Sequence, residues 1–356
     1  PNLAIASHRI FSCLHMKQNI WYSASSFSSL FKVRAISVGL ALCAVSCASD
    51  VSIQTGGSIH LSEDHPHANI TGMLLASRFT SFEDLQQCVQ IHHFNDQAEM
   101  KGLIGKRPTV ILRHTSESVN VVSVLEGGVD QDDFRRARDG GLLDKANVAM
   151  LSPYTAINRD ELMRVFYLSR RRHHQFGASD VAFYDLAERM ACNINENEFS
   201  KLYPRDATEK GFINTFNHIT AQALMTTLFS EELADFIADV HERLRPELIT
   251  GKFSKEQIDD LDEGPLDNYV DMINNEWGQE LGKKLKLKYG IEPGTKWTPE
   301  LLANYLNDIQ KYYQQSLKME FIPFRQEDYL IIRFSEKLNI VMGDLPKFVK
   351  KAEAQL

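Results

Sequence analysis

The segment Asp271-Met272-Ile273-Asn274-Asn275-Glu276-Trp277-Gly278 predicts a helix whose buried face is polar. Four of its residues recur at the i, i+3, i+4 and i+7 positions that share one face of an α-helix: Asp271, Asn274, Asn275 and Gly278. A glycine inside a helix costs about 1 kcal/mol relative to alanine. Gly278 therefore indicates that another backbone passes close to this face.

Two other predicted helices also carry polar side chains where apolar ones are expected. Asn214, His218 and Gln222 stand four residues apart, so they share one helix face that is surrounded by apolar residues. The pair His241-Glu242 lies at the end of an apolar helix. The dipole of that helix would favour an imidazolium at its C-terminal turn. We expect the three polar faces to meet in one centre.

The residue types in this centre suit hydrolysis. Imidazole and carboxylate groups act as general acids and bases, and they also bind divalent metals such as zinc. The predicted catalytic residues are His218, His241, Glu242 and Asp271, and the predicted binding residues are Asn214, Asn274 and Asn275. A metal would be held by His218, His241 and Asp271, and it would lower the pKa of a bound water. Two alternatives remain: a hydrogen-bond network that only fixes helix packing, and ligand binding without chemistry.

These segments resemble an uncharacterised family of bacterial and phage helical domains, some of them fused to toxins. The resemblance covers roughly residues 205–290 and rests on Asn214-Thr215-Phe216-Asn217-His218, His241-Glu242 and the Asp-x-x-Asn-Asn-x-x-Gly pattern of 271–278. Most relatives have arginine directly before the first histidine, where this chain has Asn217. The family brings no established activity, so the resemblance supports the location of the site.

The chain of 356 residues predicts an α+β fold that is predominantly α. We expect a small mixed α/β domain over 58–150, with strands at 70–76, 109–113 and 119–125 and a helix after Ser81. A helical bundle should follow over 151–356. The predicted N-terminal helix signals are capping boxes that begin at Asn158, Asp206 and Ser254, and the pair Thr298-Pro299.

The first 47 residues have the composition of an export signal. No Asp or Glu precedes Asp50, and Lys32-Val33-Arg34 comes directly before the apolar run 35–45. Ala44-Val45-Ser46-Cys47 resembles a bacterial lipobox, in which the cysteine is lipidated and becomes the new N-terminus. Residues 48–57 would then form a tether. Cleavage after Ala48, giving a soluble secreted or periplasmic protein, and a buried hydrophobic helix are the alternatives.

The net charge and the absence of common motifs exclude several classes of partner and function. A formal charge of −8 argues against nucleic acid, and the chain has no GxSxG, P-loop or strand-linked GxGxxG motif. The sequence therefore predicts an exported envelope protein, lipid-anchored and facing the periplasm, that meets the membrane through its lipid. It would act on an unknown envelope substrate or protein partner. Cys88 and Cys192 could pair in an oxidising compartment or remain buried thiols.

Overall fold

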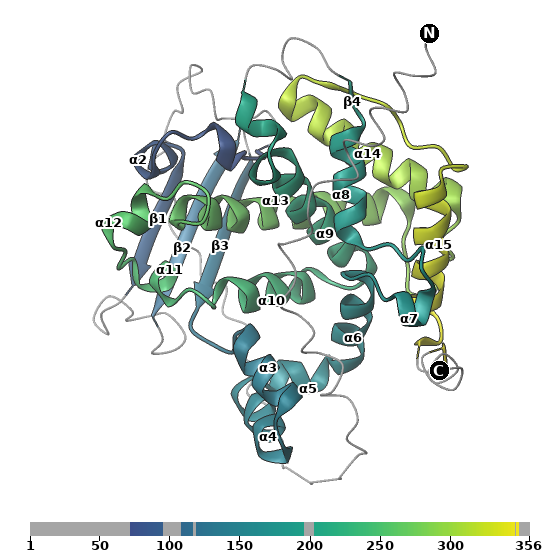
Figure 1. Ribbon diagram of the computed structural model, residues 1–356, viewed down its shortest axis with the longest axis horizontal. Helices are drawn as coiled ribbons and strands as arrows, with labels where there is room; N and C mark the ends of the chain where they lie inside the picture. The colour runs from purple at the N-terminus through teal and green to yellow at the C-terminus, as the bar shows by residue number, and fades with distance from the viewer. Residues whose placement is uncertain (1–71, 95–107, 117–118, 196–202, 346, 349–356) are drawn as a thin grey trace.

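Helix α13 (Pro265–Tyr289) runs between a small sheet and a helical layer in the computed structural model (Figure 1). The structure describes residues 72–94, 108–116, 119–195, 203–345 and 347–348. The predicted signal segment, the predicted lipidation site Cys47 and the predicted tether 48–57 lie outside these ranges. The described part confirms the predicted fold class, because helices predominate and the sheet is small.

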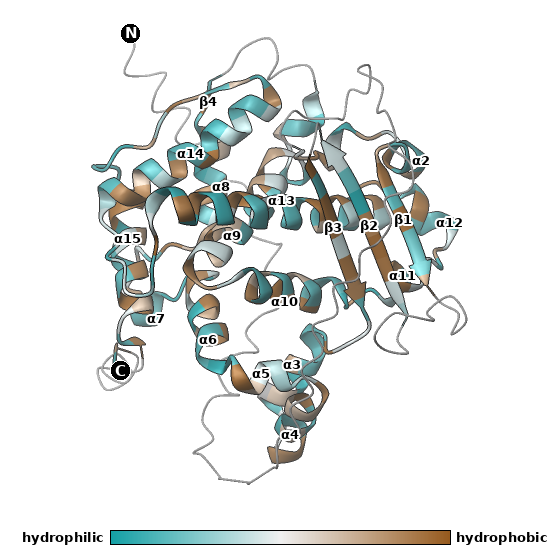
Figure 2. Ribbon diagram, turned by 180° about the vertical axis from the view of Figure 1, so that it is seen from behind, coloured by the Kyte–Doolittle hydropathy of each residue, from teal (hydrophilic) through white to brown (hydrophobic). Residues whose placement is uncertain are grey.

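The sheet consists of three antiparallel strands in the order β1 (Val89–Phe94), β2 (Thr109–Ser116) and β3 (Val119–Glu126). In β3, inward-facing residues such as Leu125 are buried while Val122 and Val124 are exposed, as alternation along a strand requires. Figure 2 shows that β3 is largely apolar, whereas β2 is apolar over only part of its length. Both strands were predicted from their β-branched residues, whereas β1 was not predicted.

The sheet shares its hydrophobic core with α13. Leu112 and Leu125 of the sheet belong to the same buried cluster as Tyr269, Ile273 and Trp277 of the helix. The small mixed domain predicted for 58–150 is thus packed directly on a helix from the region predicted as a separate bundle.

The predicted strand at 70–76 is wrong for its described part. Residues 72–75 form no strand, and a 3₁₀ turn follows at Ala76–Arg78. The reason is that the backbone N–H and C=O of Leu74 both bind the side chain of Asn274, at 2.9 and 2.8 Å. A side-chain amide therefore occupies the groups that a neighbouring strand would need.

The helical layer has a larger core of its own. It is formed by α6 (Arg159–Leu168), α8 (Phe183–Cys192), α9 (Asn214–Leu228), α14 (Pro299–Leu317) and α15 (Tyr329–Met342). Every residue of α9 is buried, so this helix is the centre of the layer. None of the helices in the described ranges has the length and apolar character needed to cross a bilayer.

Helices α9 and α13 approach each other closely at two glycines. A Cβ added to Gly278 would lie 2.8 Å from the carbonyl oxygen of Ile219, and one added to Gly282 would lie 2.6 Å from that of Ala223. Both distances are too short for a real side chain. The close approach predicted from Gly278 is therefore confirmed, and it brings the polar faces of the two helices together.

The predicted helix starts are confirmed in part. Ser254 forms a capping box with Gln257, and Thr298 caps α14 with Pro299 in its first turn. The capping boxes predicted at Asn158 and Asp206 do not form, although α6 does begin directly after Asn158. Asn158 makes no capping bond, and the Asp206 carboxylate instead accepts hydrogen bonds from Ser77 and Arg78.

The remaining elements are short or lie at the edges. Helices α3 (Gln131–Asp139), α4 (Leu142–Leu151) and α5 (Pro153–Ile157) project from one end (Figure 1), and α10 (Glu231–Glu242) lies between them and α13. The others are α2 (Phe82–Gln86), α7 (His173–Phe176), α11 (Pro246–Thr250), α12 (Lys255–Asp259), β4 (Ile194–Asn195) and β5 (Glu320–Phe321). Cys88 is a buried free thiol, which excludes the pairing with Cys192.

Candidate functional site

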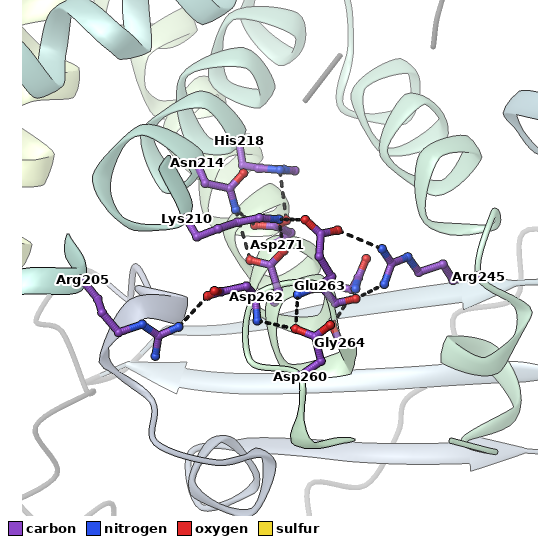
Figure 3. Close-up of polar contacts among 12 residues, drawn as sticks. Arg205, Lys210, Asn214, His218, Arg245, Asp260, Asp262, Glu263, Gly264 and Asp271 are labelled. Carbon is purple, nitrogen blue, oxygen red and sulfur yellow. Dashed lines mark hydrogen bonds and ion pairs between the residues drawn. The ribbon is translucent and has the colours of Figure 1, made fainter. Parts of the chain in front are cut away.

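The facing surfaces of α9 and α13 bring four of the predicted site residues into contact. His218 Nε2 lies 3.2 Å from Asp271 Oδ2, and His218 Nδ1 lies 2.9 Å from Asn275 Oδ1. Asn214 Nδ2 donates to Asp271 Oδ1 at 2.9 Å, so α9 holds this carboxylate through both of its oxygens (Figure 3). The four-residue spacings within each helix place these side chains in register.

His218 is an imidazolium in this arrangement. Both of its ring nitrogens face oxygens that can only accept, so both nitrogens carry a proton. Burial by itself would lower the pKa of His218, but the charge of Asp271 and the hydrogen bonds to Asp271 and Asn275 outweigh burial and raise that pKa to about 9. The ring is 7% exposed, so this cation is held almost wholly inside the protein.

The ion network continues through two residues that the sequence analysis did not identify. Asp267 lies one helical turn before Asp271, and its Oδ2 accepts from Lys210 Nζ at 2.7 Å. Lys210 Nζ also lies 3.3 Å from the Glu263 carboxylate. Burial raises the pKa of Asp267 to about 7, the charge of Asp271 adds to that rise, and Lys210 opposes it. Both residues extend the four-residue spacings by one turn, which is the signal that could have revealed them.

His241 and Glu242 approach the same centre from the end of α10. Burial lowers the pKa of His241 to about 4, and the positive charge of His218 lowers it further. His241 is therefore neutral at pH 7, and the expected imidazolium at this helix end is wrong. Burial raises the pKa of Glu242 to about 8, with a further contribution from the charge of Asp271. Glu242 is 3% exposed and is mostly protonated at pH 7.

The ring of His241 is oriented by Gln131, at the start of α3. Gln131 Nε2 faces His241 Nδ1 at 2.6 Å, so Nδ1 acts as the acceptor of this bond. The two residues are 110 positions apart. No pattern in the sequence relates residues at such a separation, so Gln131 could not be identified before the structure.

Asn274 does not join the His218 network. Its side chain is fully buried and binds the backbone of Leu74 in both directions, as described above. It is adjacent to Asn275 in sequence, but successive helical residues point about 100° apart, so one turns toward α9 and the other toward the sheet side. Its predicted role as an orienting group in the site has no contact to support it.

The metal prediction for His218, His241 and Asp271 is not supported by the side-chain geometry. Within the described ranges, no group of three or more His, Cys, Asp or Glu side chains is arranged to hold a metal ion. A metal could bind His218 only if Asp271 or Asn275 first released one of its ring nitrogens. The four polar residues and their neighbours instead provide a set of protonated and unprotonated groups.

That set has three chemical parts. Asp271, Asp267 and Lys210 form a compensated ion network around a fixed imidazolium. His241 supplies a neutral imidazole, and Glu242 supplies a protonated carboxyl. Groups with oppositely shifted pKa values in one place are typical of acid–base sites. No protein-family model, curated protein or solved structure gives a significant match to the chain.

Proposed function

We propose that the protein is a hydrolase that uses general acid–base catalysis at the centre formed by His218, His241, Glu242 and Asp271. The observation that supports this most directly is that α9, α10 and α13 contribute a neutral imidazole, a protonated carboxyl and a fixed cation to one buried place. Two of these groups are sequence neighbours with opposite pKa shifts, so one can accept a proton at the pH at which the other can donate one.

In the proposed reaction His241 is the base and Glu242 is the acid. The attacking water replaces the Gln131 amide at His241 Nδ1, and this nitrogen takes one proton from the water as the oxygen attacks. Glu242 gives its proton to the leaving group as the scissile bond breaks. The two proton transfers leave an imidazolium and a carboxylate, and exchange with solvent restores both starting forms.

His218 and Asp271 act on the charge of the transition state rather than on protons. A buried cation stabilises negative charge that develops on the attacked group, and it is effective because it is already oriented before reaction. Asp271 keeps His218 protonated, while Asn214 and Asn275 hold the carboxylate and the ring in position. Asn214 and Asn275 are therefore positioning residues.

The proposed setting is the bacterial envelope. An acid-free, basic N-terminal region followed by a short apolar run and Cys47 supports export and lipid anchoring. The substrate would then be an envelope component that water can cleave. Mass spectrometry of the mature protein from bacterial membranes tests this part, because a diacylglyceryl group on Cys47 supports anchoring and an unmodified Ser49 terminus contradicts it.

The catalytic proposal is tested with three chromogenic substrates (a carboxylic ester, a phosphodiester and a glycoside) and with isolated cell-wall sacculi. We expect hydrolysis of one of them between about pH 4 and pH 8, the pKa values of His241 and Glu242. The variant Glu242→Gln keeps the shape of the side chain and should lower kcat by about 10²-fold or more. Hydrolysis that is unchanged in this variant contradicts the assigned acid.

The matched control is Glu232→Gln, because Glu232 lies on the same helix and is exposed. This variant should retain the wild-type kcat. A similar loss in both variants would show that α10 tolerates no change of this kind, and the effect of Glu242→Gln would then not identify an acid.

A second candidate is a non-enzymatic envelope protein whose polar centre only fixes helix packing. The observation that favours it is that both nitrogens of His218 and both oxygens of Asp271 are already engaged within the protein. In that case no substrate would be cleaved by the wild-type chain. The two candidates therefore differ in the wild-type assay before any variant is made.

A further inference from the structure

A cavity lies beside the polar centre, between α6, α8, α9 and α10. Its walls are mainly apolar and include Leu162, Phe166, Phe183, Met225, Phe236 and Ile237. None of the described residues that line it carries a charge. Its volume is about 60 Å³. One water needs about 10–15 Å³ of such space, so the cavity accommodates a molecule of several non-hydrogen atoms.

One wall of the cavity carries a buried amide donor. Asn217, on α9, lines the cavity and is 2% exposed. Its Nδ2 group has no hydrogen-bond partner within the protein. Burying an amide without a partner is unfavourable, and an apolar side chain of similar size would avoid that cost. An unpaired donor on an apolar wall is the arrangement by which small-molecule pockets fix the orientation of a ligand.

We propose that this cavity binds an uncharged small molecule with an apolar body and one hydrogen-bond acceptor, such as a ketone or ester carbonyl. The apolar body would contact Phe166, Phe183 and Phe236, and the acceptor would receive the hydrogen bond of Asn217 Nδ2. The absence of charge among the lining residues that the structure describes excludes a carboxylate or an ammonium from this pocket, because a buried ion needs a partner.

This site adjoins the proposed acid–base centre, because Gln131 lines the cavity and also binds His241 Nδ1. The proposal does not rest on catalysis, and its test needs no catalytic activity. Asn217 is adjacent to His218 in sequence, but it faces the cavity while His218 faces Asp271 and Asn275 on α13. The cavity would therefore bind its ligand whether or not the polar centre hydrolyses anything.

The test is titration calorimetry of the full chain with acetophenone and with ethylbenzene, which has the same apolar ring but no carbonyl. We expect saturable binding of acetophenone that is about tenfold tighter than that of ethylbenzene. In Asn217→Leu this preference should disappear, and both compounds should bind with similar affinity. This variant removes an unpaired buried donor, so it should fold at least as well as the wild type.

The control variant is Asn304→Leu, since Asn304 is an exposed helical asparagine far along the chain from the cavity residues. It should retain the wild-type preference for acetophenone. The proposal is overturned if neither compound binds saturably to the wild type, if the wild type binds both equally, or if Asn217→Leu keeps the preference.

Discussion

The exchange of Asp271 for asparagine tests whether His218 is held as a cation. The variant keeps the size of the side chain but removes the negative charge that lies 3.2 Å from His218 Nε2. In the wild type the pKa of His218 is raised from 6.5 to about 9. At 1.36 kcal/mol per pKa unit, this rise corresponds to about 3 kcal/mol of stability. That is a substantial share of the typical 5–15 kcal/mol for a folded protein.

The direction of the pH dependence follows from the raised pKa. A group whose pKa is higher in the folded state binds its proton more tightly there, so its stabilising effect is complete below the unfolded value of about 6.5. The effect is lost as the pH rises through about 9. We therefore expect Asp271→Asn to cost about 3 kcal/mol at pH 6 and less than about 1 kcal/mol at pH 9.5.

Removal of the Asp271 charge also lowers the pKa values of two neighbouring acids, and this changes the pH dependence in the same direction. Asp271 raises the pKa values of Glu242 and Asp267, so at high pH the variant is relieved of a repulsion that the wild type retains. This relief further reduces the difference between the two proteins as the pH rises. The other titrating groups are common to both proteins and largely cancel when the two are compared.

The assay is urea unfolding of wild type and variant at five pH values from 6 to 9.5. Asp262→Asn is the matched control, because Asp262 forms an ion pair with Arg205 at 2.6 Å but is 62% exposed. An exposed pair contributes at most about 1 kcal/mol, so this variant should differ little from the wild type at every pH. A stability loss for Asp271→Asn that is the same at pH 6 and pH 9.5 would refute a charged His218.

Three further predictions concern helix contact, segment docking and the buried acid. In urea unfolding, Gly278→Ala should lower the free energy of unfolding by about 1–3 kcal/mol, because the added Cβ would lie 2.8 Å from α9. The control is Gly127→Ala, where the added Cβ would have no atom within 4 Å. It should change the free energy of unfolding by less than about 0.5 kcal/mol. Asn274→Leu should cost about 1–3 kcal/mol, because it leaves the buried Leu74 N–H unpaired while the Leu74 C=O keeps its hydrogen bond from Thr215 Oγ1. Hydrogen exchange should then be faster at the Leu74 amide, and unchanged exchange would contradict the contact. The pKa of Glu242 is raised from 4.5 to about 8, so its contribution to stability is lost as the pH rises through that range. Glu242→Gln should therefore melt at a higher temperature than the wild type at pH 9. A lower melting temperature would contradict the raised pKa.

The helical spacings in the sequence were sufficient to predict part of the site. Asn214 and His218 on one helix, and Asp271 and Asn275 on another, were identified because four-residue spacing predicts a shared face. Gly278 then indicated the close helix contact that brings these faces together. These are local patterns, and local patterns can be read without knowledge of the fold.

The remaining parts of the site depend on contacts between distant segments. Gln131 binds His241 across 110 residues, and Asn274 binds Leu74 across 200 residues. Asn274 matched the same helical pattern as Asn275, but Asn274 binds the backbone of Leu74 whereas Asn275 binds His218. Only the position of Leu74 in the fold reveals this difference. Strand β1 was not predicted either, because its sequence Val89–Phe94 contains His92 and His93, which weaken the strand pattern.

The contact between Leu74 and Asn274 also constrains the order in which the chain folds as it is synthesised. The segment at Leu74 leaves the ribosome long before Asn274, so its backbone groups cannot reach their final partner until α13 has been made. The sheet likewise lacks Tyr269, Ile273 and Trp277 of its core until then. The apolar strands of the sheet therefore have no complete core until α13 is available, and a chaperone that shields residues 72–126 up to that point should increase the yield of native protein.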